Sequence, residues 1–324
     1  MATSATFCST SRGIPVLYRR LLSAFVLIGV ALGLIGLDLW MPIRGQTGIW
    51  MIPLYYFFTL ATSWEASQLL ARKWPISSGQ LLVHCMLACT VCLFPLWYSL
   101  ALRVPYPADC PVGRPGWVLL GLFAGVGSGG VQALVHLARV RTEEAKADLE
   151  RTSLAWFLSS FVLVYVVGCM SIWWLVRMTG DSVQGMLNLI AMLAITKFAD
   201  TGAYFAGKAF GRRKLVPSIS PGKTVEGLIG GLLMSVAVAY LFLRWIVPSL
   251  GGQPGTYLWG PALLGCLLTM VGLVGDLLES MVKRTVGAKD SGGLLPGLGG
   301  VWDVTDSLLP TAIIGYLGVI AKLT

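Results

Sequence analysis

One stretch of the sequence, GDLLESMVKRTVGAKDSGGLLPGLGGVWDVTDS, combines acidic residues, cations and glycines. Asp276, Glu279 and Lys283 are spaced i, i+3 and i+7, so a helix would present all three side chains on one face. Beyond a loop of glycines and a proline, Asp303 and Asp306 lie three residues apart where another apolar stretch begins. Carboxylate oxygens from two helix ends are ligands that Mg²⁺ prefers. The spacing therefore predicts a cation site that can clamp a triphosphate and stabilise charge on a transferred group.

A second polar stretch, KFADTGAYFAGKAFGRRKLVPSISPGKTVEGLIGG, lies earlier in the chain. It begins with Lys197 and Asp200, which fall near the inner end of an apolar run. A charge inside a membrane costs about 2.5–3.5 kcal/mol on insertion scales, so each of these side chains needs a partner or water. Because the two residues are three positions apart, they share a helical face and can neutralise each other. In one interpretation the two charges neutralise each other. In the other, they line a water-filled cavity at the membrane edge.

The rest of the second stretch is a cationic loop that leads into a new helix. It holds five cations from Lys208 to Lys223, with hydroxyls close to the expected start of the helix. The free N–H groups of a helix amino terminus, with such neighbours, form an anion site. The glycine spacing differs from that of a Walker A loop. A positive-inside anchor explains the arginines but leaves the Ser-Pro-Gly-Lys-Thr string and Glu226 unexplained, so phosphate binding is favoured.

The acids of the first stretch also have a structural interpretation, in which they balance nearby cations at the membrane edge. Five of the fifteen Asp and Glu residues of the chain fall between residues 275 and 307, beside glycines that let backbone approach a ligand. This clustering favours a ligand site. The residues alone thus indicate a membrane-embedded site for Mg²⁺ and phosphate, where a nucleotide and a lipid headgroup can meet.

The composition requires that membrane helices position these residues. Of 324 residues, 56% are hydrophobic and 12% are charged, and the mean hydropathy is +0.75. Soluble domains carry about 25% charged residues, so a soluble enzyme is excluded, as are a secreted disulfide scaffold and a disordered chain. Helices satisfy their own backbone groups in lipid, and nothing here alternates like a barrel strand. We therefore predict an all-α, polytopic integral membrane helical bundle.

A crossing helix needs about 20 apolar residues, and this length predicts about nine transmembrane helices. The predicted spans are residues 21–40, 48–63, 80–101, 116–138, 154–176, 185–206, 225–247, 257–275 and 307–322. With a cytoplasmic amino terminus, 17 Lys and Arg residues fall inside and 6 outside, and Lys197 lies within a span. The positive-inside rule favours this orientation, in a bacterial-type inner membrane with the site facing the cytoplasm. The same rule accounts for the net charge of +9, so no nucleic acid is expected as a partner.

Two regions of different character follow from this layout. Residues 1–180 form the N-terminal transmembrane helices, and residues 181–324 form a C-terminal catalytic region with cytoplasmic loops 207–224 and 276–306. No internal repeat supports an inverted-repeat transporter. Glycines between residues 121 and 130 permit close helix packing, within the chain or between the chains of a possible homodimer.

The two polar stretches resemble the phosphatidate cytidylyltransferases (CDP-diacylglycerol synthases). The signature of that family runs roughly S-x-x-K-R-x4-K-D-x-x-x-x-x-P-G-H-G-G-x-x-D-R-x-D. The positions that match it are Ser280, Lys283, Arg284, Lys289, Asp290, Pro296, Gly297, Gly299, Gly300, Asp303 and Asp306. The earlier stretch resembles the family through D-T-G-A-Y, F-G and S-I-S-P-x-K-T-x-E-G. The likeness covers about residues 185–310 firmly and the amino-terminal spans by hydropathy alone.

The resemblance implies a reaction in which CTP and phosphatidate give CDP-diacylglycerol and pyrophosphate. A phosphatidate oxygen attacks the α-phosphorus of CTP in line, and positioning with charge neutralisation supplies most of the acceleration. CTP, phosphatidate or a similar lipid phosphate, and membrane lipids are the expected partners. The expected cofactor is Mg²⁺, alone or with a second cation.

The resemblance also implies roles for individual residues. Asp276 and Asp303 are the expected metal ligands, with Asp306 as a further ligand and Asp200 in support. The residues expected to hold phosphates are Lys223, Lys283, Arg284 and Lys289, and Lys283 and Lys289 are counted as catalytic together with the two aspartates. Those expected to orient the phosphates are Ser218, Ser220 and Thr224, with Asp290 and Glu226 as their partners.

Two positions depart from the family pattern. Leu298 stands where the family has histidine, and Val304 stands where it has arginine. Losing an acid–base group costs about 10²–10⁴-fold in rate, so a degenerate non-catalytic paralogue is one alternative. The others are altered substrate choice, a CTP-dependent lipid or polyprenol kinase, and an ion-coupled transporter. A transporter predicts polar residues throughout the spans, whereas here they gather at the cytoplasmic ends.

Overall fold

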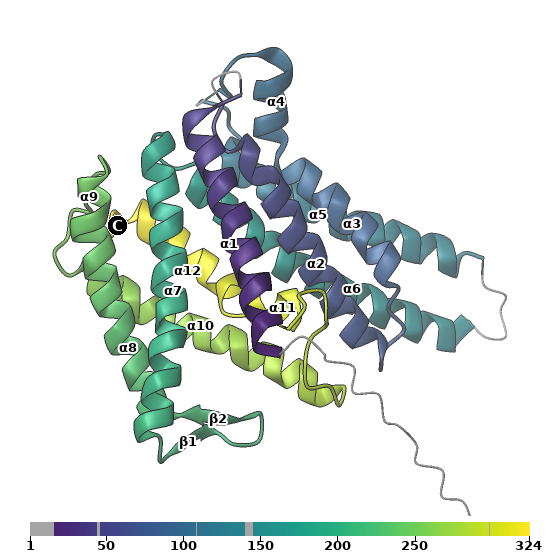
Figure 1. The fold of residues 1–324 in the computed structure, drawn as a ribbon. Helices are drawn as coiled ribbons and strands as arrows, with labels where there is room; N and C mark the ends of the chain where they lie inside the picture. Colours follow the sequence, from purple (N-terminus) through teal and green to yellow (C-terminus); the bar gives the residue numbers. More distant parts are fainter. Residues whose placement is uncertain (1–15, 44–45, 108, 140–144, 298) are drawn as a thin grey trace, which may run out of the picture.

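The protein is described by a computed structural model that covers residues 16–43, 46–107, 109–139, 145–297 and 299–324. It is a bundle of helices with one small β-hairpin (Figure 1). The helices before the hairpin are α1 (Val16–Trp40), α2 (Ile52–Ala71), α3 (Ser78–Cys92), α4 (Phe94–Leu102), α5 (Gly113–Leu137), α6 (Ala145–Arg177) and α7 (Ser182–Phe210). The hairpin strands are β1 (Lys214–Val216) and β2 (Ser220–Thr224). The helices after it are α8 (Val225–Tyr240), α9 (Val247–Ser249), α10 (Gly260–Thr285), α11 (Val301–Thr305) and α12 (Leu308–Ile320).

Seven stretches of helix in the described residues are long and apolar enough to cross a membrane. They are Leu22–Trp40, Gly113–Leu137, Lys146–Arg177, Ser182–Phe210, Val225–Ser249, Gly260–Thr285 and Val301–Ile320. The helices α3 and α4 would form an eighth, bent by 57° next to Pro95, which cannot continue the hydrogen-bond ladder of α3. The chain is therefore a polytopic helical membrane protein, as its composition predicted.

The number of spans and the direction of insertion stay predictions. Each of the nine predicted ranges holds a helix, but α2, at the predicted span 48–63, carries Thr, Ser and Glu side chains and does not reach the same hydropathy. The cytoplasmic amino terminus rests on the distribution of Lys and Arg, several of which lie outside the described residues.

The small residues of α5 bring it against α3 within the chain. A side chain at Gly121 would place its Cβ 2.6 Å from the carbonyl oxygen of Ala88, and one at Gly125 would place it 2.9 Å from Ala88 Cβ. Either approach is closer than real Cβ contacts allow, so only glycine permits this helix spacing. These two glycines thus serve packing within one chain, which was one of the two possibilities that the sequence left open.

A buried ion pair ties α1 to α6. The guanidinium of Arg177 donates to the carboxylate of Asp38, and both side chains are 1% exposed. Asp38 also accepts from the backbone N–H of Gly48 at 2.7 Å. Because a buried charge is costly without a partner, this pair fixes α1 against the end of α6.

The hairpin occupies the loop predicted at residues 207–224. The helix α7 extends to Phe210, and β1 pairs antiparallel with β2 in the register Lys214–Thr224. The hydroxyl oxygen of Thr224 accepts from the N–H of Gly227 at 3.1 Å, which caps α8 and begins the helix there. Figure 1 shows the hairpin projecting at the end of the bundle where α10 also ends. The fold thus places the two polar stretches of the sequence side by side.

Candidate active site

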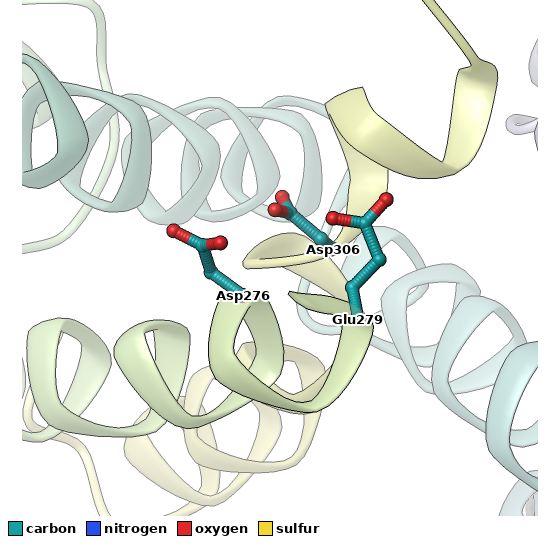
Figure 2. A group of neighbouring side chains, drawn as sticks. All are labelled: Asp276, Glu279 and Asp306. Carbon is teal, nitrogen blue, oxygen red and sulfur yellow. The ribbon is translucent and has the colours of Figure 1, made fainter. Parts of the chain in front are cut away.

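Three carboxylates converge where α10 meets the junction of α11 and α12. Asp276 and Glu279 project from one face of α10. The side chain of Asp306, from the junction of α11 and α12, lies between them (Figure 2). One oxygen from each of these three residues lies within 4.8 Å of the other two. The i, i+3 spacing on α10 accounts for the first pair, since residues three apart share a helical face. We call these three residues the carboxylate cluster.

The donor set of the carboxylate cluster fits a divalent cation. Glu279 is 2% exposed, and its Oε1 atom is buried without a hydrogen-bond partner among the described residues. Three acidic groups so close together repel one another, and burial strengthens that repulsion. Hard oxygen ligands at this spacing are what Mg²⁺ takes, so a cation here would satisfy the orphaned oxygen and relieve the repulsion.

Two lysines border the carboxylate cluster from different elements. The Nζ atom of Lys223, on β2, lies 2.5 Å from Oδ2 of Asp276. The Nζ atom of Lys283, one turn beyond Glu279 on α10, lies 2.9 Å from Oε2 of Glu279. With a cation held by the acids, the two flanking ammonium groups would form an electrostatic environment suited to a polyphosphate.

Asp303 is not a member of the carboxylate cluster. Its Oδ1 accepts from Lys283 at 2.8 Å, and its Oδ2 accepts from the N–H of Gly300 at 2.8 Å. Asp303 is the third residue of α11, and a carboxylate at that position bends back to cap the helix. The family resemblance implied Asp276, Asp303 and Asp306 as metal ligands, whereas the fold groups Asp276 and Asp306 with Glu279. Ligation by Asp303 stays a prediction, and its contacts assign it to holding Lys283 and the loop before α11.

Lys197 and Asp200 pin α7 to the segment that carries Asp306. Lys197 Nζ donates to the carbonyl of Val304 at 2.8 Å and to the hydroxyl of Ser307 at 2.9 Å. Asp200 lies 3.4 Å from Lys197 and 2.9 Å from the hydroxyl of Ser307. The two charges therefore neutralise each other in part and also fix the backbone beside the carboxylate cluster.

The hairpin residues predicted to bind substrate lie in three different situations. Ser218 is exposed in the turn, and Ser220 is half-buried in β2. Thr224 is buried as the cap of α8. The carboxylate of Glu226 accepts from the N–H groups of Arg212 and Arg213 at 3.0 and 3.2 Å. Thr224 and Glu226 thus stabilise the base of the hairpin. Among the described hairpin residues that were predicted to bind substrate, Lys223 alone forms an ion pair with the carboxylate cluster.

The remaining predicted residues lie at the carboxyl end of α10 and just beyond it. Arg284 Nε donates to the carbonyl of Ile219 at 3.3 Å and so joins α10 to the hairpin turn. Lys289 and Asp290 are exposed in the segment between α10 and α11. Phosphate binding by Arg284 and Lys289, and the supporting role of Asp290, stay predictions. Leu298, the first departure from the family pattern, lies outside the described residues.

Glu65, which was not among the predicted site residues, lies on α2 in the N-terminal half and reaches the glycine-rich segment before α11. It is 2% exposed, and its Oε2 accepts from the backbone N–H of Trp302 at 2.9 Å and from the hydroxyl of Ser291 at 3.4 Å. A side chain at Gly300 would place its Cβ 2.5 Å from that oxygen. The signal that could have indicated it is a single charged residue within an apolar helix.

Comparison with known proteins places the chain in a family. Residues 18–320 match the cytidylyltransferase family, and the chain belongs to it. It is 40% identical over 152 residues to a phosphatidate cytidylyltransferase of Haemophilus influenzae, an alignment covering 47% of this chain and 52% of that protein.

Two further relatives extend this comparison. A phosphatidate cytidylyltransferase of Brucella suis is 46% identical over 138 residues, which are 43% of this chain and 48% of that protein. An uncharacterized protein of Escherichia coli, YnbB, is 38% identical over 158 residues, which are 48% of this chain and 49% of that protein. The chain thus spans about half the length of the curated relatives it matches.

Proposed function

We propose that this protein is a CTP:phosphatidate cytidylyltransferase, which transfers CMP from CTP to phosphatidate and releases pyrophosphate. The observation that carries the proposal is the carboxylate cluster, with Lys223 and Lys283 against it. Membership of the cytidylyltransferase family supports cytidylyl transfer as the reaction. The relatives named phosphatidate cytidylyltransferase support phosphatidate as the lipid substrate. We further propose an inner-membrane location with the cluster facing the cytoplasm, where CTP is made available.

We assign each residue of the candidate site a role in this reaction. Asp276, Glu279 and Asp306 would hold Mg²⁺, which when bound neutralises phosphate charge in the transition state. Lys223 on β2 and Lys283 on α10 would contact the triphosphate and orient it, so that the phosphatidate oxygen attacks the α-phosphorus in line and pyrophosphate leaves. Asp303 acts as a positioning residue, because it holds the ammonium group of Lys283 in place.

Neither departure from the family pattern removes a member of the carboxylate cluster. Val304 lacks the guanidinium expected there, but its backbone carbonyl still accepts from Lys197, so the segment between Asp303 and Asp306 stays fixed. Because all three carboxylates and both flanking lysines are present, we favour an active enzyme over a degenerate paralogue. No described contact favours an ion path, so the transporter alternative gains no support from the described part of the chain.

Product analysis tests the proposal directly. The purified full chain, given CTP labelled at the α-phosphate, phosphatidate and Mg²⁺, is expected to produce labelled lipid and free pyrophosphate. The Asp306→Asn variant should lose about 10²–10³-fold in rate, the scale of several kcal/mol of charge stabilisation. Glu150→Gln, an exposed acid on α6 outside the cluster, is the matched control and should keep the wild-type rate.

The competing functions give different products. Lipid labelled from the γ-phosphate of CTP, with release of CDP, would identify a kinase. No lipid-linked label from either position at any Mg²⁺ concentration would identify a non-catalytic protein. Recovery of activity in Leu298→His from an inactive wild type would trace that loss to the missing histidine.

A further inference from the structure

An apolar groove of about 250 Å³ runs between α2, α6 and α10. Each helix lines it with residues three, four or eight apart, the spacing of a single helical face. The lining side chains include Ala66, Leu70, Leu158, Tyr165, Leu278 and Met281. Phe161 and Met281 are 55% and 45% exposed at its rim, so the groove opens on the lipid-facing side of the bundle.

The groove and the carboxylate cluster share the helix α10. Leu278 and Met281 alternate along α10 with Glu279, so one helix presents apolar residues to the groove and acids to the cluster. The last residue of α10, Thr285, and Trp74, just beyond α2, also line the groove. Tyr165 lines the groove from α6, and Leu278, which lines it from α10, directly precedes Glu279 of the carboxylate cluster.

Two hydrogen-bond donors in the groove wall lack partners. Trp302 is 5% exposed and lines the groove, and its indole Nε1 has no hydrogen-bond partner among the described residues. The hydroxyl of Tyr165 is likewise buried and unpartnered within the described part of the chain. An indole N–H only donates and a phenol can donate, so both groups call for an acceptor. Leaving such groups unpaired in an apolar environment costs free energy, and a ligand with acceptor oxygens would recover it.

We propose that this groove holds an acyl chain of the phosphatidate substrate, with its ester carbonyls near Tyr165 and Trp302; this inference rests on the proposed function. A diacylglycerol phosphate offers ester oxygens that accept and no N–H or O–H group in its acyl region, which complements two unpaired donors. Its acyl chains match the apolar wall and the opening toward lipid. Its phosphate would then extend past Tyr165 toward the carboxylate cluster.

Photolabelling tests occupancy without relying on turnover. The full chain in nanodiscs is exposed to phosphatidate that carries a diazirine in one acyl chain, and the crosslinked peptides are mapped by mass spectrometry. Labels are expected within residues 158–166 of α6 and 278–285 of α10, and excess dioleoyl phosphatidate should remove them. Labels spread equally over other lipid-facing helices such as α1, or displaced as well by phosphatidylcholine, would overturn the proposal in favour of ordinary bilayer contact.

A groove-filling variant tests the functional consequence. Met281→Trp narrows the rim at an exposed position, so we expect the KM for dioleoyl phosphatidate to rise about tenfold, the effect of crowding a packed apolar site. The KM for short-chain dihexanoyl phosphatidate and for CTP should stay within about twofold of wild type on the same scale. Val164→Trp, at a 46% exposed position of α6 that does not line the groove, is the control and should change none of the three.

The outcomes separate this inference from the proposed function. Equal changes for long-chain and short-chain phosphatidate, or no change for either, would overturn the acyl groove while cytidylyl transfer stands. A wild type that forms no CDP-lipid from either substrate would refute the proposed function, and the photolabelling pattern would still decide whether the groove binds phosphatidate.

Discussion

Lys223 of the hairpin lies 2.5 Å from Asp276 of α10, and this ion pair joins the two polar stretches of the sequence. The hairpin turn is tied to the same helix by the hydrogen bond from Arg284 to the carbonyl of Ile219. The cationic hairpin is thereby held beside the carboxylate cluster, and its Lys223 ammonium group contacts that cluster directly. When a polyphosphate and its cation bind, the ammonium group of Lys223 can release the carboxylate of Asp276 and pair with a phosphate oxygen instead.

Replacing Lys223 should therefore reduce activity more than stability. Lys223→Met removes the ammonium group, and we expect kcat/KM to fall about 10²-fold, as for loss of one charged donor to a reacting phosphate. Lys223→Arg keeps the charge with a different geometry and should recover part of that loss. Steady-state kinetics with varied CTP measures both variants, and a Lys223→Met enzyme with wild-type kcat/KM would remove this lysine from the site.

Chelation should abolish activity reversibly. The carboxylate cluster offers oxygen ligands alone, so EDTA should stop labelled-lipid formation, and Mg²⁺ or Mn²⁺ should restore it. Zn²⁺, which favours nitrogen and sulfur ligands, should restore little. An enzyme that works undiminished in EDTA after dialysis would contradict a catalytic cation.

Glu65 should support the loop that carries the site. Glu65→Ala leaves the N–H of Trp302 and the hydroxyl of Ser291 without their acceptor, which costs about 1–3 kcal/mol for a buried unpaired group. We expect a lower melting temperature in detergent and a raised KM for CTP. Glu65→Gln keeps an acceptor oxygen in the same shape and is the control, so it should lose less on both measures. Equal behaviour of Gln and Ala would argue against these hydrogen bonds.

The pair Asp38–Arg177 should matter for stability and not for chemistry. Removing one partner leaves a buried charge uncompensated and is expected to destabilise the protein by about 3–5 kcal/mol. Asp38→Leu with Arg177→Leu removes both charges and should cost less than either single change. A double-mutant cycle by thermal unfolding in detergent measures the coupling. Single changes without effect would show that α1 is held mainly by other contacts.

The sequence predicted the class of the fold and the segments that supply the candidate site because both follow from local patterns. Apolar runs of span length predict membrane helices whatever their partners. The spacing of Asp276 and Glu279 predicts a shared helical face from the geometry of one helix. The clustering of acids beside glycines pointed to a cation site, and the acids of the described cluster come from that segment.

The contacts between segments could not be predicted in the same way. The spacing of Asp303 and Asp306 in the sequence does not tell which of them lies beside Asp276. That depends on the cap that Asp303 forms on α11 and on the path of the chain from α11 to α12. The position of Glu65 depends on packing α2 against a loop more than two hundred residues later. Leu298 and Val304 stand out against a family pattern, but their consequence depends on neighbours that only the folded chain supplies.

The most direct test of the central claim is to locate the cation. Crystals of the full chain grown with Mn²⁺ and CTP should show an anomalous peak at about 2.0–2.4 Å from carboxylate oxygens of Asp276 and Asp306, in the usual range for hard cations with oxygen ligands. Glu279 should be a ligand of the same ion or hydrogen-bonded to its water. A manganese peak bound elsewhere, with Asp276 and Asp306 both free of metal in the CTP complex, would contradict the account.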